Sequence, residues 1–131
     1  MTTTVDLLAA VCAHHSAFGL PAMASVHAVA SLSAPQVTVQ FACHDPSAIA
    51  RALLAWADTL NQVTARAWRL PQGDSVHLSV TGLLPGGCSV LVYGGLPATH
   101  RALGADLPPN ATTTIPLPML WPAATVEEAS A

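Results

Sequence analysis

The sequence predicts an α+β domain in which two helices cover one face of an antiparallel sheet of about five strands. The expected order is α-β-β-α-β-β-β, followed by a proline-rich tail. Segments that alternate apolar and polar residues, the period of a strand, are interrupted by segments with apolar residues every three or four positions, the period of a helix. The last three strand segments are joined by short loops, which fit antiparallel neighbours because parallel neighbours need long crossovers.

The first helix is expected over residues 5–15, with Thr4 as its cap and Gly19 ending it. Its apolar face comprises Leu7, Val11 and Phe18. Strands follow over residues 22–32 and 36–43. The turn chemistry of residues 33–35 between them predicts an antiparallel pair.

The second helix is expected to begin at Pro46. Asp45 can accept hydrogen bonds from the first backbone N–H groups, and a proline suits the first helical position because its missing N–H would have no partner there. The packing face of this helix comprises Ile49, Leu53, Trp56 and Leu60. Three strands are expected next, over residues 63–68, 75–81 and 88–93, and then a short helix over residues 98–107.

The chain is expected to form one domain over residues 1–107 and an extended tail over residues 108–131. The tail is interrupted by prolines, so it cannot continue a regular helix. Its last residues, from Thr125, have the composition of a disordered end.

Charged residues make up only 8 % of the chain, against about 25 % in a typical soluble domain. There is no lysine, and four arginines are outnumbered by seven acids, which disfavours binding to a nucleic-acid backbone. A DNA-binding regulator would need an oligomer that gathers the arginines, Arg51, Arg66, Arg69 and Arg101, into one patch. A surface so poor in charge predicts a homo-oligomer or a subunit of a complex.

The apolar runs are far shorter than the roughly 20 residues of a membrane-spanning helix. The first residues lack the positive charge of a secretory signal, so we expect a cytoplasmic protein without membrane association. The three cysteines, Cys12, Cys43 and Cys88, are widely separated, and each lies in an apolar run. They are expected to be reduced, buried thiols.

No catalytic residue, metal site or cofactor is predicted. Cysteines and histidines near residues 12–15 and 43–44 are suitable zinc ligands, but their spacing matches no standard zinc motif. The acids Asp45, Asp58 and Asp74 are explained as a helix cap, an exposed helical residue and a turn residue, which leaves few carboxylates for acid–base catalysis.

The strand alternation divides the sheet into two faces. The face toward the helices is expected to carry Val26, Val37, Val39, Val63, Val76, Leu78, Val80, Val90 and Val92. The opposite face is expected to carry His27, Thr38, Gln40, Arg66, Trp68, His77, Ser79, Leu91 and Tyr93. Aromatic side chains, arginine and adaptable polar groups are typical of recognition surfaces, although the same face could be an ordinary solvated sheet or be covered by the tail.

The predicted function is therefore that of a small, non-catalytic protein-interaction module, which binds itself or another subunit. The candidate partner-binding residues are His27, Gln40, Arg66, Trp68, His77 and Tyr93 on the sheet, and Leu117, Met119, Leu120 and Trp121 in the tail. The alternative is a metal-dependent or small-ligand-binding enzyme that uses sheet-face histidines such as His27 and His77.

The alanine-rich style of residues 45–57 and of residues 84–90, in a chain without lysine, resembles that of small uncharacterised proteins of high-GC actinobacteria and their phages or mobile elements. The resemblance implies a bacterial or phage cytosolic origin. It carries over no catalytic or binding residue.

Overall fold

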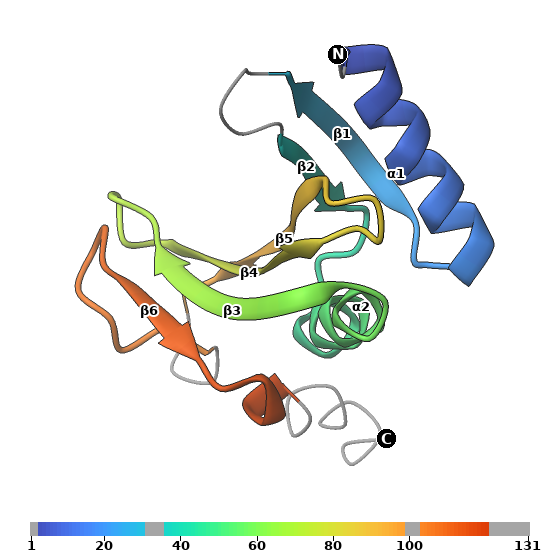
Figure 1. Cartoon of the computed structure of the whole chain (residues 1–131). Helices are drawn as coiled ribbons and strands as arrows, with labels where there is room; N and C mark the ends of the chain where they lie inside the picture. Colours follow the sequence, from blue (N-terminus) through green and yellow to red (C-terminus); the bar gives the residue numbers. More distant parts are fainter. Residues whose placement is uncertain (1–2, 31–35, 99–102, 121–131) are drawn as a thin grey trace.

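The structure is a computed structural model that describes residues 3–30, 36–98 and 103–120. Two α-helices and a six-stranded sheet form its core (Figure 1). The helices are α1 (Thr4–Phe18) and α2 (Pro46–Ala57), and a 3₁₀ turn, η1, spans Leu117–Met119. The strands are β1 (Met23–Val29), β2 (Gln36–Phe41), β3 (Asn61–Arg69), β4 (Ser75–Leu83), β5 (Ser89–Pro97) and β6 (Thr112–Ile115). The α+β class and the element order through β5 are as predicted.

The sheet is mixed, which corrects the expectation of a purely antiparallel sheet. Its strand order is β1-β2-β5-β4-β3-β6, and β5 lies parallel to β2 with Val37 opposite Val90 and Val39 opposite Val92. The meander from β3 to β5 and the pair of β1 and β2 are antiparallel, as the short loops predict. The parallel pair arises because α2 carries the chain away from β2 and the meander brings β5 back beside it, so no single short loop indicates this contact.

Helix α1 packs against β1 and β2. Thr3, rather than Thr4, is its cap: the Thr3 hydroxyl accepts from the Asp6 N–H at 3.1 Å, and the Asp6 carboxylate accepts from the Thr3 N–H at 3.0 Å. The Thr3 backbone N–H, which donates to the carboxylate, and the Thr3 side chain beside it lower the pKa of Asp6. Gly19 ends the helix in the left-handed region, at φ 58°, as predicted. The expected apolar face is wrong at Phe18, whose side chain is 55 % exposed.

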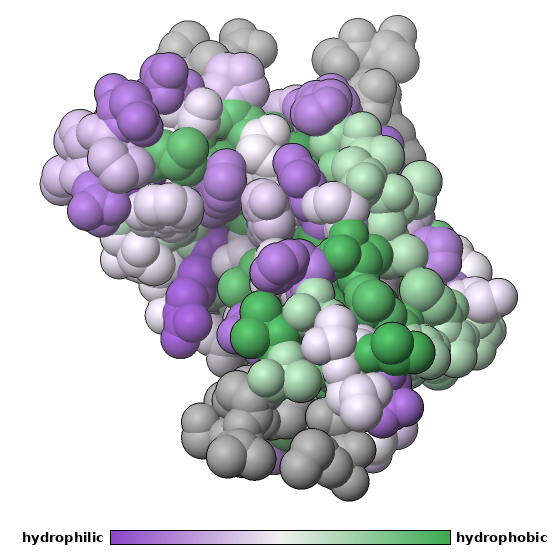
Figure 2. Space-filling model, turned by 90° about the horizontal axis from the view of Figure 1, so that it is seen from above, coloured by the Kyte–Doolittle hydropathy of each residue, from purple (hydrophilic) through white to green (hydrophobic). Residues whose placement is uncertain are grey.

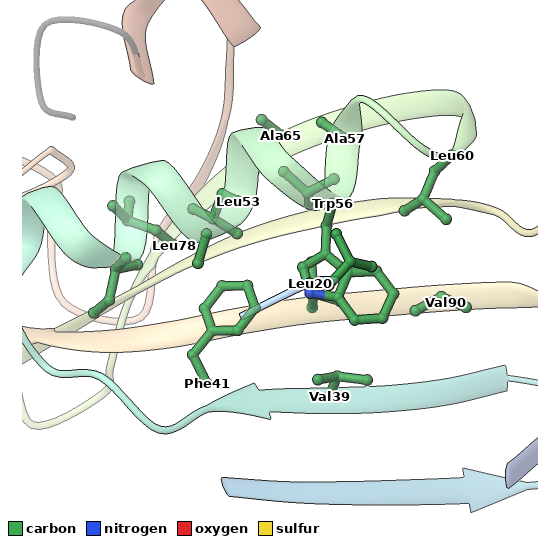
Figure 3. Close-up of a cluster of buried hydrophobic side chains, with 14 of the residues drawn as sticks. Leu20, Val39, Phe41, Leu53, Trp56, Ala57, Leu60, Ala65, Leu78 and Val90 are labelled. Carbon is green, nitrogen blue, oxygen red and sulfur yellow. The ribbon is translucent and has the colours of Figure 1, made fainter. Parts of the chain in front are cut away.

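Helix α2 packs against β4 and β5 and is capped as predicted, with the Asp45 carboxylate accepting from the Ala48 N–H at 3.1 Å. Trp56 is fully buried, and Figure 3 shows it among other buried side chains, including Phe41 and Val39 of β2 and Leu20 from the segment between α1 and β1. Its indole N–H has no hydrogen-bond partner within the described residues.

The tail is not separate from the domain, because residues 112–115 form β6 and pair with β3. The short helix expected over residues 98–107 is also wrong where the structure describes it: residues 103–107 form turns. Arg69 holds these turns by donating to the carbonyls of Ala105, Leu107 and Gly73 at 3.0, 2.7 and 2.9 Å. Residues 99–102 of the expected helix and residues 125–131, expected to be disordered, lie outside the described residues.

The cysteines differ from the expectation of buried thiols. Cys12 is exposed, and Cys43 and Cys88 are half-buried. Cys12 follows Val11 on α1, and its exposure shows that an apolar run in a helix does not bury every residue in it. Burial raises the pKa of the Cys43 and Cys88 thiols. No helix in the described part of the chain has the length and hydrophobicity needed to cross a membrane.

Candidate functional site

The candidate site is the face of the sheet that is turned away from the two helices. Residues on the helix side of β2, β4 and β5 are fully buried, whereas their neighbours along each strand are half-buried or exposed. The expected division into two faces is thus present, although Val26 and Val63 are only partly buried. We call this surface the open sheet face. It comprises His27, Thr38, Gln40, Thr64, Arg66, Trp68, His77, Ser79, Thr81, Leu91 and Tyr93.

Strand register places these residues in rows across the sheet. One row runs from Gln40 through Tyr93 and Ser79 to Arg66. The next row sets His77 between Trp68 on β3 and Gly95 on β5. Four strands therefore contribute to one continuous surface. The predicted partner-binding residues that lie within these two rows are Gln40, Arg66, Trp68, His77 and Tyr93.

Three aromatic side chains of this face contact one another: Trp68 and His77 from the second of these rows and Tyr93 from the first. We call these three side chains the aromatic row. The rings of Trp68 and His77 meet edge to face with centroids 5.5 Å apart, and the rings of His77 and Tyr93 stack at 5.0 Å. The Trp68 indole donates to the side-chain oxygen of Asn110 at 3.2 Å. A Cβ atom at Gly95 would come within 3.3 Å of the His77 ring, so this glycine leaves the space in which the ring lies.

Burial between its neighbours lowers the pKa of His77 below its usual value of 6.5. The imidazole is therefore neutral at neutral pH and contributes a flat, weakly polar surface rather than a charge. Arg66, which is exposed, supplies the positive charge of this face. An aromatic centre beside an arginine has the composition of an energetically important contact region in protein interfaces.

His27 is exposed on β1 and does not share a site with His77 on β4. Strands β2 and β5 lie between them, a separation of roughly 14 Å at the usual strand spacing. Within the described residues, no three His, Cys, Asp or Glu side chains are grouped so that they could hold a metal ion. The two histidines of the alternative hypothesis thus cannot bind one ion together.

The tail residues do not form one binding surface. Leu120 is 1 % exposed and belongs to the hydrophobic core, so it is not available to a partner. Leu117 also packs against the core, whereas Met119 is 48 % exposed. Trp121 lies outside the described residues. The burial of Leu120 could not be predicted because it depends on β6 pairing with β3.

Within the part of the chain that the structure describes, the arginines are not gathered into one patch. Arg69 is occupied by three backbone carbonyls, Arg51 lies on α2, and Arg66 lies on the open sheet face. Arg101 lies outside the described residues.

A groove of about 630 Å³ that the sequence did not indicate lies between α1 and the loop joining β4 to β5. It is lined mainly by apolar residues, among them Leu7, Phe18, Pro85 and Cys88, together with His14. The His14 Nε2 atom lies 2.8 Å from the Thr59 hydroxyl, which itself donates to the Trp56 carbonyl at 2.9 Å. The hydroxyl proton is thus engaged, so His14 is the donor through Nε2–H. Burial lowers the pKa of His14.

Seen from above, the surface mixes hydrophilic and hydrophobic residues, with several hydrophobic ones gathered together (Figure 2). Such a surface is consistent with the small share of charged residues in the sequence. No family model, curated protein or solved structure matches the chain. The functional assignment therefore depends on the chemistry of the site itself.

Proposed function

We propose that the protein is a small interaction module that binds another protein, either a second copy or a different subunit, through the open sheet face. The observation that carries this proposal is the aromatic row, in which Trp68, His77 and Tyr93 contact one another on the side of the sheet opposite the helices. Catalysis is not part of the proposed function.

The residue types of the open sheet face and the small loss of side-chain entropy on binding both favour its use as a protein-binding surface. Tryptophan, tyrosine and arginine are the residue types that contribute most to binding in protein interfaces, particularly where they are pre-positioned. Trp68 is held by Asn110 and His77 is held between two rings, so little side-chain entropy remains to be lost on binding. Backbone pairing within the sheet also keeps the surface rigid.

The proposal is tested by placing a negative charge at the aromatic row. The Tyr93→Glu and Trp68→Glu variants are expected to weaken association at this face by at least about tenfold, because a buried interface penalises an unpaired charge. Sedimentation velocity over a range of concentrations measures self-association, and retention of a partner on immobilised protein measures binding to another subunit.

Val5→Glu is the matched control, since Val5 is 72 % exposed on α1. This variant is expected to behave as the original protein does. The proposed function is wrong if the original chain and Tyr93→Glu sediment identically at every concentration and the original chain retains no protein that Tyr93→Glu fails to retain. Circular dichroism establishes that each variant is folded.

A further inference from the structure

The two edges of the sheet differ in how they are protected. Strands β1 and β6 are the outermost strands, at opposite ends of the sheet (Figure 1). An edge strand carries backbone N–H and C=O groups that can pair with another strand, and proteins usually block such edges with charges, prolines or very short strands. β6 has four residues and is followed directly by Pro116. It therefore offers little backbone for pairing.

β1 has none of these protections except a bulge at its start. It has seven residues, Met23–Val29, and includes no proline and no Asp, Glu, Lys or Arg. The bulge lies between Met23 and Ser25, which leaves Ser25–Val29 as a regular strand. Ser25, His27 and Val29 are exposed, and Val29 is 51 % exposed. The regular part of this strand thus has three exposed side chains on one face and carries no charged residue.

We propose that the outer edge of β1 pairs with the same edge of a second copy of the chain, antiparallel and related by a two-fold axis. Identical strands meet without like-charge repulsion because neither carries a charged residue. Pairing of β1 with β6 of another copy would engage four residues rather than the five of Ser25–Val29, and it would be a head-to-tail contact that does not close. The two-fold arrangement uses the longer edge on both sides and closes at two chains.

The register of the pair follows from the faces of the strand. Ser25, His27 and Val29 lie opposite Gln40, Thr38 and Gln36 of β2, so all three lie on the side of the sheet that carries the open sheet face. A continuous sheet must set residues of the same face opposite one another. The regular segment is centred on His27, so His27 lies at the two-fold axis opposite its own copy, and Ser25 lies opposite Val29.

Substitution of the edge tests the pairing. Val29→Lys introduces the charge by which natural edges are protected, and it occurs twice in the two-fold pair. We expect it to weaken dimerisation by at least about tenfold, as measured by sedimentation equilibrium. Thr113→Lys places the same residue on exposed β6 and is expected to leave the dimer unchanged. Thermal unfolding shows whether each variant is folded.

Crosslinking tests the register without destabilising the edge. In a chain with Cys12→Ser, His27→Cys is expected to form an intermolecular disulfide when an added oxidant, such as diamide, takes up the two electrons and two protons of the thiols. Paired residues in neighbouring strands have Cα atoms about 4.5–5.5 Å apart, within the range for a disulfide. Ser25→Cys is expected not to crosslink, because two copies of residue 25 would lie roughly 13 Å apart along the strands.

Edge pairing and binding on the open sheet face give different results. Tyr93→Glu is expected to leave the edge dimer intact. A dimer that is lost in Tyr93→Glu but kept in Val29→Lys would overturn edge pairing and would support dimerisation through the open sheet face. Equal weakening by Val29→Lys and Thr113→Lys would show pairing of β1 with β6 instead. A chain that stays monomeric at high concentration, or crosslinking through Ser25→Cys in preference to His27→Cys, would also overturn the pairing.

Discussion

At the level of single residues, the least expected finding is that two histidines are kept neutral by their surroundings. His14 is 8 % exposed and donates to Thr59, and its ring lies 5.8 Å from that of Trp56. His77 is enclosed by Trp68 and Tyr93 on the other side of the sheet. Each side chain contributes packing and, for His14, a hydrogen bond, but neither contributes a charge.

These two histidines predict a dependence of stability on pH. Because their pKa values are lowered from 6.5 in the folded chain, the unfolded chain binds more protons once the pH falls below that value. Their contribution to the free energy of unfolding is complete above pH 6.5 and is lost as the pH falls through the folded pKa values. Urea unfolding between pH 8 and pH 5 measures the loss, separately from that of Asp6, which titrates below 3.8.

A double variant, His14→Gln with His77→Gln, is expected to flatten this dependence. The glutamine at position 14 retains an N–H donor for Thr59. An equally steep dependence in the double variant would show that other groups cause it.

Arg69 predicts a second effect at this scale. Its guanidinium donates to three carbonyls in two different loops, and a lysine ammonium cannot reproduce this planar geometry. We expect Arg69→Lys to lower the free energy of unfolding by about 1–3 kcal/mol. Arg66→Lys, at an exposed position of the same strand, is the control and should change stability by less than about 0.5 kcal/mol. Equal urea midpoints for the two variants would contradict the role of Arg69.

At the level of elements, the contact between α2 and β5 depends on a residue without a side chain. A Cβ atom at Gly94 would lie 2.8–2.9 Å from three carbons of Ile49, which is closer than packed atoms approach. The absence of that atom allows the helix to lie directly on the strand. Nothing in the sequence distinguishes Gly94 in this respect from Gly95, because the requirement comes from the approach of α2.

Gly94→Ala is therefore expected to destabilise the protein by about 1–3 kcal/mol, since the helix must move away from the sheet. Gly86→Ala is the matched control: a Cβ atom there would have no neighbour within 4 Å. Thermal unfolding compares the two variants, and a melting temperature for Gly94→Ala equal to that of Gly86→Ala would show that the contact is adaptable.

The elements that could be predicted are those determined by neighbours in sequence. Asp45 followed by Pro46 defines the start of α2, Gly19 ends α1, and strict alternation identifies β4. Strand β6 could not be predicted in this way. Its four residues are mostly threonine beside a proline, and they become a strand only because the exposed edge of β3 pairs with them.

At the level of the whole molecule, the candidate site could be predicted only in part. Alternation assigned Trp68, His77 and Tyr93 to one face, but the stacking of the three rings depends on β4 lying between β3 and β5 and on the space left by Gly95. The sequence predicts that Leu120 binds a partner, but Leu120 is buried, because its position depends on contacts with distant residues. Side-chain contacts that depend on the order of the strands in the sheet cannot be predicted from the spacing of residues along the sequence.

The parallel contact between β2 and β5 has a consequence for how the chain folds. The pair of β1 and β2 and the meander from β3 to β5 are each built from strands that follow one another, so each half can form by local chain closure. The sheet becomes continuous only when β5 docks on β2, which joins distant parts of the sequence. Until that step, β2 and β5 both present unpaired valine-rich edges. The docking step is thus the stage at which the folding chain is most exposed to aggregation.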